Sequence, residues 1–355
     1  MFVPTFSSLF ALFAYVSAHD TAKPVIIDTD FFSDVDDVGA LAIANVLHNC
    51  GLCDLQAVMI NTPSKYGALA ASVVNTYYGN GDVPIGALRP LTNETFSDSY
   101  MFTLGEYASK ISHNFPHKLQ YANDTSTPLD LYTSLLQSAE PNSTTIISIG
   151  FLTNLASLLS TPTGHSLISQ KVQKLIIMGG RYPSGWEFNF GGSDPSSTIT
   201  TLSLWPAHIP ITYSGGELGE AIFSGQSLHY TAPSTSPIRA AYEWYVGRYA
   251  TARESWDPIT VLYGILGLQG FEKLGIQSPF KYVNEFGYNN ITAKNASNAW
   301  VFDERVRNQH WLGLADGVGN ETVAWILNQF YERDPIVKGC FGFGSGSAGH
   351  GRAEL

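Results

Sequence analysis

The sequence is short of positive charge. Its 355 residues include 19 Lys and Arg against 30 Asp and Glu, so the formal net charge is -11. No basic run reverses this balance, and the composition therefore argues against binding to a nucleic-acid backbone. Long apolar runs are lacking as well, because no stretch reaches the roughly 20 apolar residues that a transmembrane helix needs. We expect a partner that is neither a nucleic acid nor a membrane.

Cysteine is scarce too, since the chain contains only Cys50, Cys53 and Cys340. Cys50 and Cys53 have CxxC spacing, but no second CxxC pair accompanies them. This pattern argues against a zinc site and against a thioredoxin-like redox site. Two alternatives stay open: one structural disulfide with one thiol left over, or three buried thiols.

Residues 1–18 resemble a cleavable signal peptide. An apolar core at residues 6–16 precedes a small-residue cleavage site ending at Ala18, although the usual basic segment is missing because the first lysine is Lys23. Six Asn-x-Ser/Thr sequons follow, at Asn93, Asn123, Asn142, Asn290, Asn295 and Asn320. Leader and sequons together predict a secreted glycoprotein whose mature chain begins near His19.

Residues 24–47 concentrate the negative charge. An apolar, β-branched run at the start of this stretch predicts a buried strand, and an aliphatic run at its end predicts a helix. Between them lie five aspartates within ten residues, Asp28, Asp30, Asp34, Asp36 and Asp37, with no Lys or Arg. Like charges this close together in a partly desolvated turn repel one another strongly. A bound Ca²⁺ or Mg²⁺, which prefers oxygen ligands, would relieve the repulsion, so the stretch predicts a metal site.

A simpler interpretation covers part of this cluster. Asp36 and Asp37 would cap a helix and Asp28 would cap a turn, as acidic residues often do. That interpretation accounts for two or three of the five aspartates, and we therefore favour the metal.

Strands alternate with helices along most of the chain. The expected strands are residues 25–27, 55–60, 83–85, 144–149, 174–178 and 209–213. The expected helices include residues 38–47, 67–78, 128–140 and 195–205, and from Pro237 onward the pattern is mostly helical. This alternation predicts an α/β fold with a single doubly wound, Rossmann-like domain and a mainly parallel central sheet. We place this domain at residues 19–338 and expect the Gly/Ser-rich tail, residues 339–355, to be disordered.

Polar residues follow several of these strands, where open α/β sheets bind their ligands. A metal at such an edge can lower the pKa of a bound water while an aspartate accepts the proton. Asn61 follows the second strand, and Glu187 and Asn189 lie in an aromatic loop after Met178. This loop suits a small polyhydroxylated ligand with an aromatic part. Ordinary loop polarity is the alternative for Glu187 and Asn189, and an N-cap before Pro258 is the alternative for Asp257.

In order and spacing these motifs resemble the inosine-uridine preferring nucleoside hydrolases. The motifs are DTD with a following DD, Ile149-Gly-Phe-Leu-Thr-Asn154, Met178-Gly-Gly, Glu187-Phe-Asn189 and Asp194-Pro195. The resemblance covers about residues 24–262 and implies Ca²⁺-dependent hydrolysis of ribonucleosides to ribose and free base. Together with the leader it implies a secreted, fungal-like eukaryotic member with the longer DxDxxxDxDD loop.

The resemblance also implies residue roles. Asp30, Asp37, Asp257 and the carbonyl of Ile149 would bind Ca²⁺, and Asp30 would also be the general base. The remaining candidates would bind the substrate: Asp36, Asn61, Met178, Glu187, Asn189 and Trp256. The leaving-group step departs from the family, because many members have His where this chain has Trp256. We expect aromatic stacking there and a preference for purines.

Two other functions remain as alternatives. A metal-dependent phosphatase of the haloacid dehalogenase kind would use Asp28 as nucleophile and Asp30 as acid. A secreted nucleoside- or sugar-binding protein would keep the metal site without turnover, an option that Trp256 in place of His leaves open. The sequence also leaves open the role of Asp34 and the oligomeric state, a homo-oligomer included.

Overall fold

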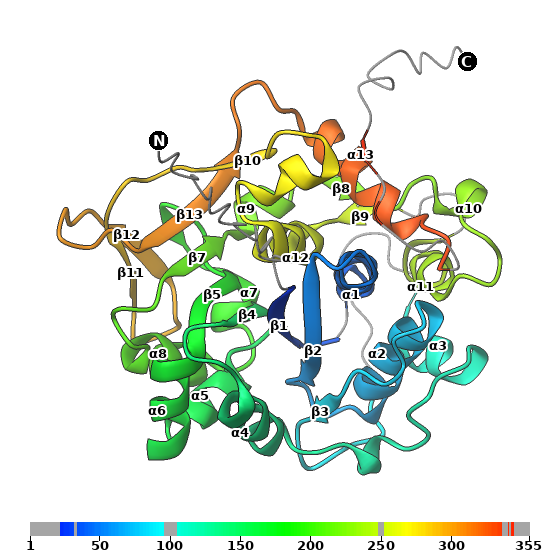
Figure 1. Cartoon of the computed structure of the whole chain (residues 1–355), viewed down its shortest axis with the longest axis horizontal. Coiled ribbons are helices and arrows are strands. Elements are labelled where there is room, and N and C mark those ends of the chain that lie inside the picture. The colour runs from blue at the N-terminus through cyan, green and yellow to red at the C-terminus, as the bar shows by residue number, and fades with distance from the viewer. Residues whose placement is uncertain are drawn as a thin grey trace, which may run out of the picture.

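The computed structural model describes residues 22–31, 34–95, 105–247, 252–335, 340 and 342–343. An eight-stranded sheet crosses the centre of the molecule, in the order β10-β13-β7-β5-β4-β1-β2-β3 (Figure 1). Its strands are β1 (Lys23–Thr29), β2 (Cys53–Ile60), β3 (Ile85–Ala87), β4 (Thr144–Ile149), β5 (Val172–Met178), β7 (Ile211–Ser214), β10 (Phe280–Tyr282) and β13 (Gln309–Leu314). All neighbours pair in parallel except β10 and β13. The α/β fold with a mainly parallel sheet, predicted from the alternation of strands and helices, is confirmed.

Side chains of the central strands alternate between two hydrophobic cores. Val25 and Ile27 of β1 belong to one core, and Ile26 between them belongs to the other. The first core packs under α1 (Asp36–Asn49), α2 (Lys65–Tyr77), α3 (Ala108–Asn114), α11 (Pro237–Val246), α12 (Trp256–Leu266) and α13 (Asn320–Tyr331). The second core packs under α4 (Pro128–Ser138), α5 (Thr153–Leu159), α6 (Pro162–Lys171) and α8 (Pro195–Leu204). Apolar residues on both faces explain why these strands read as continuous hydrophobic runs.

Several helices begin with the same local signal, a side-chain cap followed by proline. Thr127, Thr161 and Asp194 each accept a hydrogen bond from a backbone N–H of the first turn of α4, α6 and α8, respectively. Proline then occupies the first helical turn, where the missing N–H costs nothing. This signal predicted the starts of α4 and α8, while the start of α6 was not predicted.

The last third of the chain is less helical than its pattern predicted. Residues 280–314 contain β10 and β13 of the main sheet, together with β11 (Tyr288–Ile291) and β12 (Asn298–Val301), which form a small sheet with β6 (Ser184–Gly185). The prediction of a mostly helical region is therefore wrong here. Strands of three to six residues at a sheet edge carry too few apolar positions for their period to be recognised.

One disulfide joins the segment after α1 to the C-terminal part of the described chain. Cys50, just after α1, bonds to Cys340, while Cys53 is a buried free thiol. Phe343 also packs against the C-terminal helix, and its N–H donates to the carbonyl of Leu274 at 2.8 Å. The predicted signal peptide and most of the predicted tail lie outside the described residues. Within the described part of the chain, no helix has the length and apolarity needed to cross a bilayer.

Candidate active site

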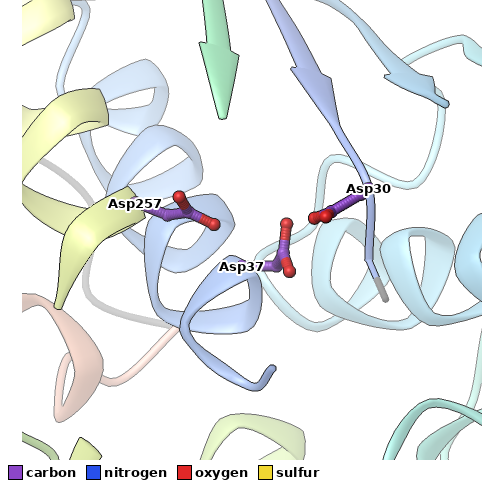
Figure 2. A group of neighbouring side chains, drawn as sticks. All are labelled: Asp30, Asp37 and Asp257. Carbon is purple, nitrogen blue, oxygen red and sulfur yellow. The ribbon is translucent and has the colours of Figure 1, made fainter. Parts of the chain in front are cut away.

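Three buried carboxylates from distant parts of the chain meet at the carboxyl ends of the central strands. Asp30 directly follows β1, Asp37 lies in the first turn of α1, and Asp257 lies in the first turn of α12. One oxygen from each lies within 4.8 Å of the others, and Figure 2 shows the side chains converging on one point. The β4 strand, which neighbours β1, ends there at Ile149.

The charges at this point repel one another. Burial is the largest cause that raises the pKa of Asp30, Asp37 and Asp257, and the neighbouring carboxylates raise it further. A divalent cation would remove this penalty, and the donors fit one, because all are oxygens and the site offers neither thiolate nor imidazole. Asp30, Asp37, Asp257 and the carbonyl of Ile149 are the residues that would hold it.

Helix capping does not account for these aspartates. The N-cap of α1 is Val35 and that of α12 is Ser255, and neither makes a side-chain cap hydrogen bond. Asp37 instead accepts hydrogen bonds from the Thr29 hydroxyl and the Phe31 N–H, and Asp36 accepts one from the Asp257 N–H at 3.0 Å. The acidic side chains therefore connect β1, α1 and α12 rather than completing their own helices.

Asp28 is separated from this group. Its carboxylate is fully buried and accepts hydrogen bonds from Asn61 and Tyr132 at 2.8 Å each and from Asn154 at 3.1 Å. Burial raises the pKa of Asp28 to about 7 despite these three donors. Asp28 thus ties the end of β1 to the end of β2, to α4 and to α5, behind the site.

A cavity of about 430 Å³ opens beside the three carboxylates. It is lined by nine of the ten residues that the sequence proposed: Asp30, Asp36, Asp37, Ile149, Met178, Glu187, Asn189, Trp256 and Asp257. The tenth, Asn61, does not line the cavity, because its amide donates to Asp28. This position argues against the prediction that Asn61 binds the substrate, because the sequence alone does not show in which direction this side chain points.

One wall of the cavity presents a buried carboxylate at the start of a short helix. Glu187 precedes α7 (Phe188–Gly191) and accepts backbone hydrogen bonds from Asn189 at 2.7 Å and Gly180 at 3.1 Å. Burial raises the pKa of Glu187 to about 7. The Asn189 amide donates to the Met178 carbonyl at 3.3 Å, so the loop after β5 and α7 are held together. The wall can accept hydrogen bonds from a polyhydroxylated ligand.

Aromatic rings form the outer walls. The Trp256 indole N–H donates to the carbonyl of Gly216 at 2.8 Å, on the four-residue helix α9 (Gly216–Gly219), which fixes the ring at the cavity edge. Trp186 and Phe188 also line the cavity and are 47% and 45% exposed, so they provide apolar surface at its mouth.

Sequence reasoning did not identify two ion pairs in the cavity lining. Asp34 accepts hydrogen bonds from Arg253 Nε at 2.8 Å and Nη2 at 2.6 Å, and Arg181 pairs with Glu220. Arg181 directly follows the Met178-Gly-Gly motif, which was a usable signal. No sequence signal pointed to Arg253, because its partner Asp34 lies 219 residues away in the chain.

The family model described as inosine-uridine preferring nucleoside hydrolase matches residues 25–272. Among solved structures, a plant nucleoside hydrolase superposes with a TM-score of 0.63 at 20% identity, covering 87% of this chain and 99% of its own. A purine-preferring ribonucleoside hydrolase from Gardnerella vaginalis gives a TM-score of 0.63 at 14% identity, covering 88% and 98%. The inosine-uridine preferring nucleoside hydrolase from Bacillus anthracis gives 0.57 at 16% identity, covering 87% and 99%. No curated protein matches the chain significantly in sequence.

The two kinds of aspartate should affect stability in opposite directions. In chelator at pH 8, we expect Asp30→Asn to raise the free energy of unfolding by about 1 kcal/mol, because its raised pKa means that ionising the carboxylate costs folding free energy. Asp28→Ala should lower it by about 3 kcal/mol, since it leaves three buried donors unpaired. Urea denaturation measures both.

Exposed Asp316 provides the control, and Asp316→Asn should change the unfolding free energy by less than about 0.5 kcal/mol. The stabilising effect of Asp30→Asn should shrink as the pH falls, because protonation then removes the same charge from the wild type. Equal losses from Asp28→Ala and Asp30→Asn would contradict the division into a structural and a repulsive carboxylate.

Proposed function

The chain belongs to the inosine-uridine preferring nucleoside hydrolase family, a group of hydrolases that act on ribonucleosides, and we propose that it hydrolyses them with the help of bound Ca²⁺. The bond broken is the N-glycosidic bond, and the products are ribose and free base. The observation that supports this proposal most is the convergence of Asp30, Asp37 and Asp257 beside a cavity with a polar and an aromatic wall.

Each residue of the cavity has a proposed role in catalysis or in substrate binding. Asp30 accepts the proton of the attacking water as general base. Asp36, Glu187 and Asn189 hold the ribose hydroxyls, and Met178 packs against the sugar. Bound Ca²⁺ would polarise the water and chelate the ribose hydroxyls, which accounts for a preference for ribonucleosides over deoxyribonucleosides.

Negative charge in the cavity also suits the transition state. Breaking a glycosidic bond leaves positive charge on the sugar ring, as in an oxocarbenium ion. Buried carboxylates that cannot reorganise stabilise this charge more than they stabilise the neutral substrate. Glu187 and Asp36 are both buried in the cavity wall and are placed to do so.

The position of Asp28 argues against the phosphatase alternative, in which Asp28 would be the nucleophile. Asp28 does not line the cavity, and its carboxylate is engaged by Asn61, Tyr132 and Asn154. A binding protein without turnover is distinguished by assay, because only a hydrolase releases reducing sugar from inosine.

Calcium dependence is tested by removing one ligand. We expect Asp37→Ala to lose Ca²⁺ binding and at least about 100-fold of its activity, because activation of the attacking water depends on the bound metal. Isothermal titration with Ca²⁺ and a reducing-sugar assay with and without chelator give both values. Asp54→Ala, a partly exposed aspartate outside the cavity, is the control. Retention of wild-type Ca²⁺ affinity by Asp37→Ala would overturn the ligand assignment.

Purine preference follows from the aromatic walls. Trp256 stands where many family members have a histidine, and an indole N–H cannot transfer a proton at neutral pH. Its N–H is moreover donated to Gly216. The larger face of a purine gains more from stacking on Trp256 than a pyrimidine does.

Replacing Trp256 should therefore penalise purines most. We expect Trp256→Ala to lower kcat/KM for inosine by about 10-fold and to affect uridine less, since ring stacking contributes roughly 0.5–2 kcal/mol. Initial rates on inosine, adenosine and uridine give the comparison, and Trp325→Ala is the control, because Trp325 lies on α13 outside the cavity. Wild-type preference for uridine, or a larger loss on uridine, would refute stacking.

We also propose that the protein is a secreted, fungal-like glycoprotein, on the evidence of the leader-like residues 1–18 and six sequons. Intact-mass measurement of material from its native host should show a chain that begins near His19 and carries N-glycans. Five of the sequon asparagines are exposed and accessible: Asn93, Asn123, Asn142, Asn290 and Asn295. An unglycosylated chain that starts at Met1 would refute this proposal.

A further inference from the structure

The proposed reaction leaves an electron pair on the departing base, and among the described residues no histidine lines the cavity to stabilise it. When the bond between C1′ of ribose and the base nitrogen breaks, both electrons stay on the nitrogen. Either a proton or a hydrogen-bond donor has to meet this developing negative charge. Among the described residues that line the cavity, the cationic side chains are Arg181 and Arg253.

Stacking on Trp256 alone does not solve the problem. The guanidinium of Arg253 already lies over the Trp256 ring, 5.2 Å from its centroid. A cation on the indole uses the negative potential of the ring, so a protonated base on Trp256 gains less from the same interaction. Trp256 thus provides a surface for the base rather than charge for the leaving group.

Arg253 has its donors committed elsewhere. Nε and Nη2 bind the Asp34 carboxylate, and Nη1 binds Glu254 at 2.7 Å. The side chain is 5% exposed and contacts Tyr245 on α11 as well as Trp256. All three nitrogens of Arg253 are thus engaged by carboxylates, and the side chain holds the wall together and neutralises Asp34.

Arg181 is arranged differently. Its Nη2 binds Glu220, and its Nε and Nη1 make no hydrogen bond to any residue that the structure describes. The backbone of Arg181 is fixed from both sides by Asn298, which accepts from its N–H at 2.8 Å and donates to its carbonyl at 2.9 Å. The side chain is 37% exposed and lines the cavity, and it is held at its base and at one nitrogen while Nε and Nη1 remain available as donors.

The position of Arg181 matches the base end of the cavity. A Cβ added to Gly216 would lie 3.2 Å from Glu187 Cγ and 3.9 Å from Arg181 Nη2. The carbonyl of the same glycine holds the Trp256 indole. Arg181 thus lies beside the point where the wall assigned to ribose, at Glu187, meets the wall assigned to the base, at Trp256.

We propose that Arg181, oriented by Glu220, is the leaving-group residue of this enzyme. This inference rests on the proposed hydrolysis. As the C1′–N bond breaks, the guanidinium donates a hydrogen bond to an acceptor atom of the base, which departs as the anion. The water oxygen forms the new bond to C1′, and its proton passes to Asp30. That proton or one from solvent then neutralises the base, so nucleoside and water are converted to ribose and base.

The test uses a substrate whose leaving group needs no help. 4-Nitrophenyl β-D-ribofuranoside has the same sugar but releases a stable phenolate. We expect Arg181→Met to lower kcat for inosine by about 100-fold, the effect typical of losing one placed donor in a transition state. For the nitrophenyl riboside the same variant should stay within about threefold of wild type, because its leaving group departs unaided. Arg181→Lys should recover part of the loss on inosine.

Two further variants separate positioning from general charge effects. Glu220→Gln should reduce kcat for inosine by about 10-fold and spare the nitrophenyl riboside, since Arg181 remains but loses its orienting partner. Arg305→Met removes an exposed, paired arginine outside the cavity and should change neither rate.

Each outcome has a distinct meaning. Equal losses on both substrates would overturn the proposal in favour of a structural role for Arg181, and unchanged rates on both would overturn it as well. If the wild type hydrolyses neither inosine nor the nitrophenyl riboside, the proposed function itself fails.

Discussion

Repulsion among buried carboxylates is the constraint on which the rest of this structure depends. Asp30, Asp36, Asp37 and Asp257 lie together in a buried site, and burial and neighbouring charges raise the pKa of each. Such a cluster costs folding free energy unless cations compensate it. Arg253 offsets the charge of Asp34 from the side, and a divalent cation fits between the remaining ligands. The repulsion therefore lowers stability at the site that we propose for metal and sugar.

The fold holds these carboxylates in place despite their repulsion. Adjacent parallel strands β1 and β4 end at the same edge of the sheet, and α1 and α12 begin there, packed against each other and against the first hydrophobic core. Asp28 strengthens the same edge from behind by connecting β1 with Tyr132 of α4 and Asn154 of α5. Because these elements are buried on both sides, the carboxylates cannot move apart to relieve their repulsion. The positions of the three carboxylates are thus fixed by the fold.

The two ends of the cavity differ in how closely they follow the family. The sugar end is built from the motifs that carried the resemblance, namely the aspartates, Met178 and the Glu187–Asn189 segment. The proposed base end combines Trp256, in the first turn of α12, with the ion pair between Arg181, which follows β5, and Glu220, which follows α9. In the function that we propose, the family motifs act on ribose, while the choice of base and the way it leaves depend on residues outside these motifs.

The sequence by itself determined the strand–helix alternation, the capped helix starts and the acidic stretch that predicts a metal, because each is encoded by residues within one or two turns of one another. The family resemblance, and no local pattern, predicted that Asp257 joins Asp37 from 220 residues away. Tertiary structure alone decided that Asn61 binds Asp28 outside the cavity and that Arg253 pairs with Asp34. It also decided which cysteines pair and that residues 280–314 contain strands. Such contacts depend on side-chain direction and on how distant elements pack, and neither leaves a periodic trace in the local sequence.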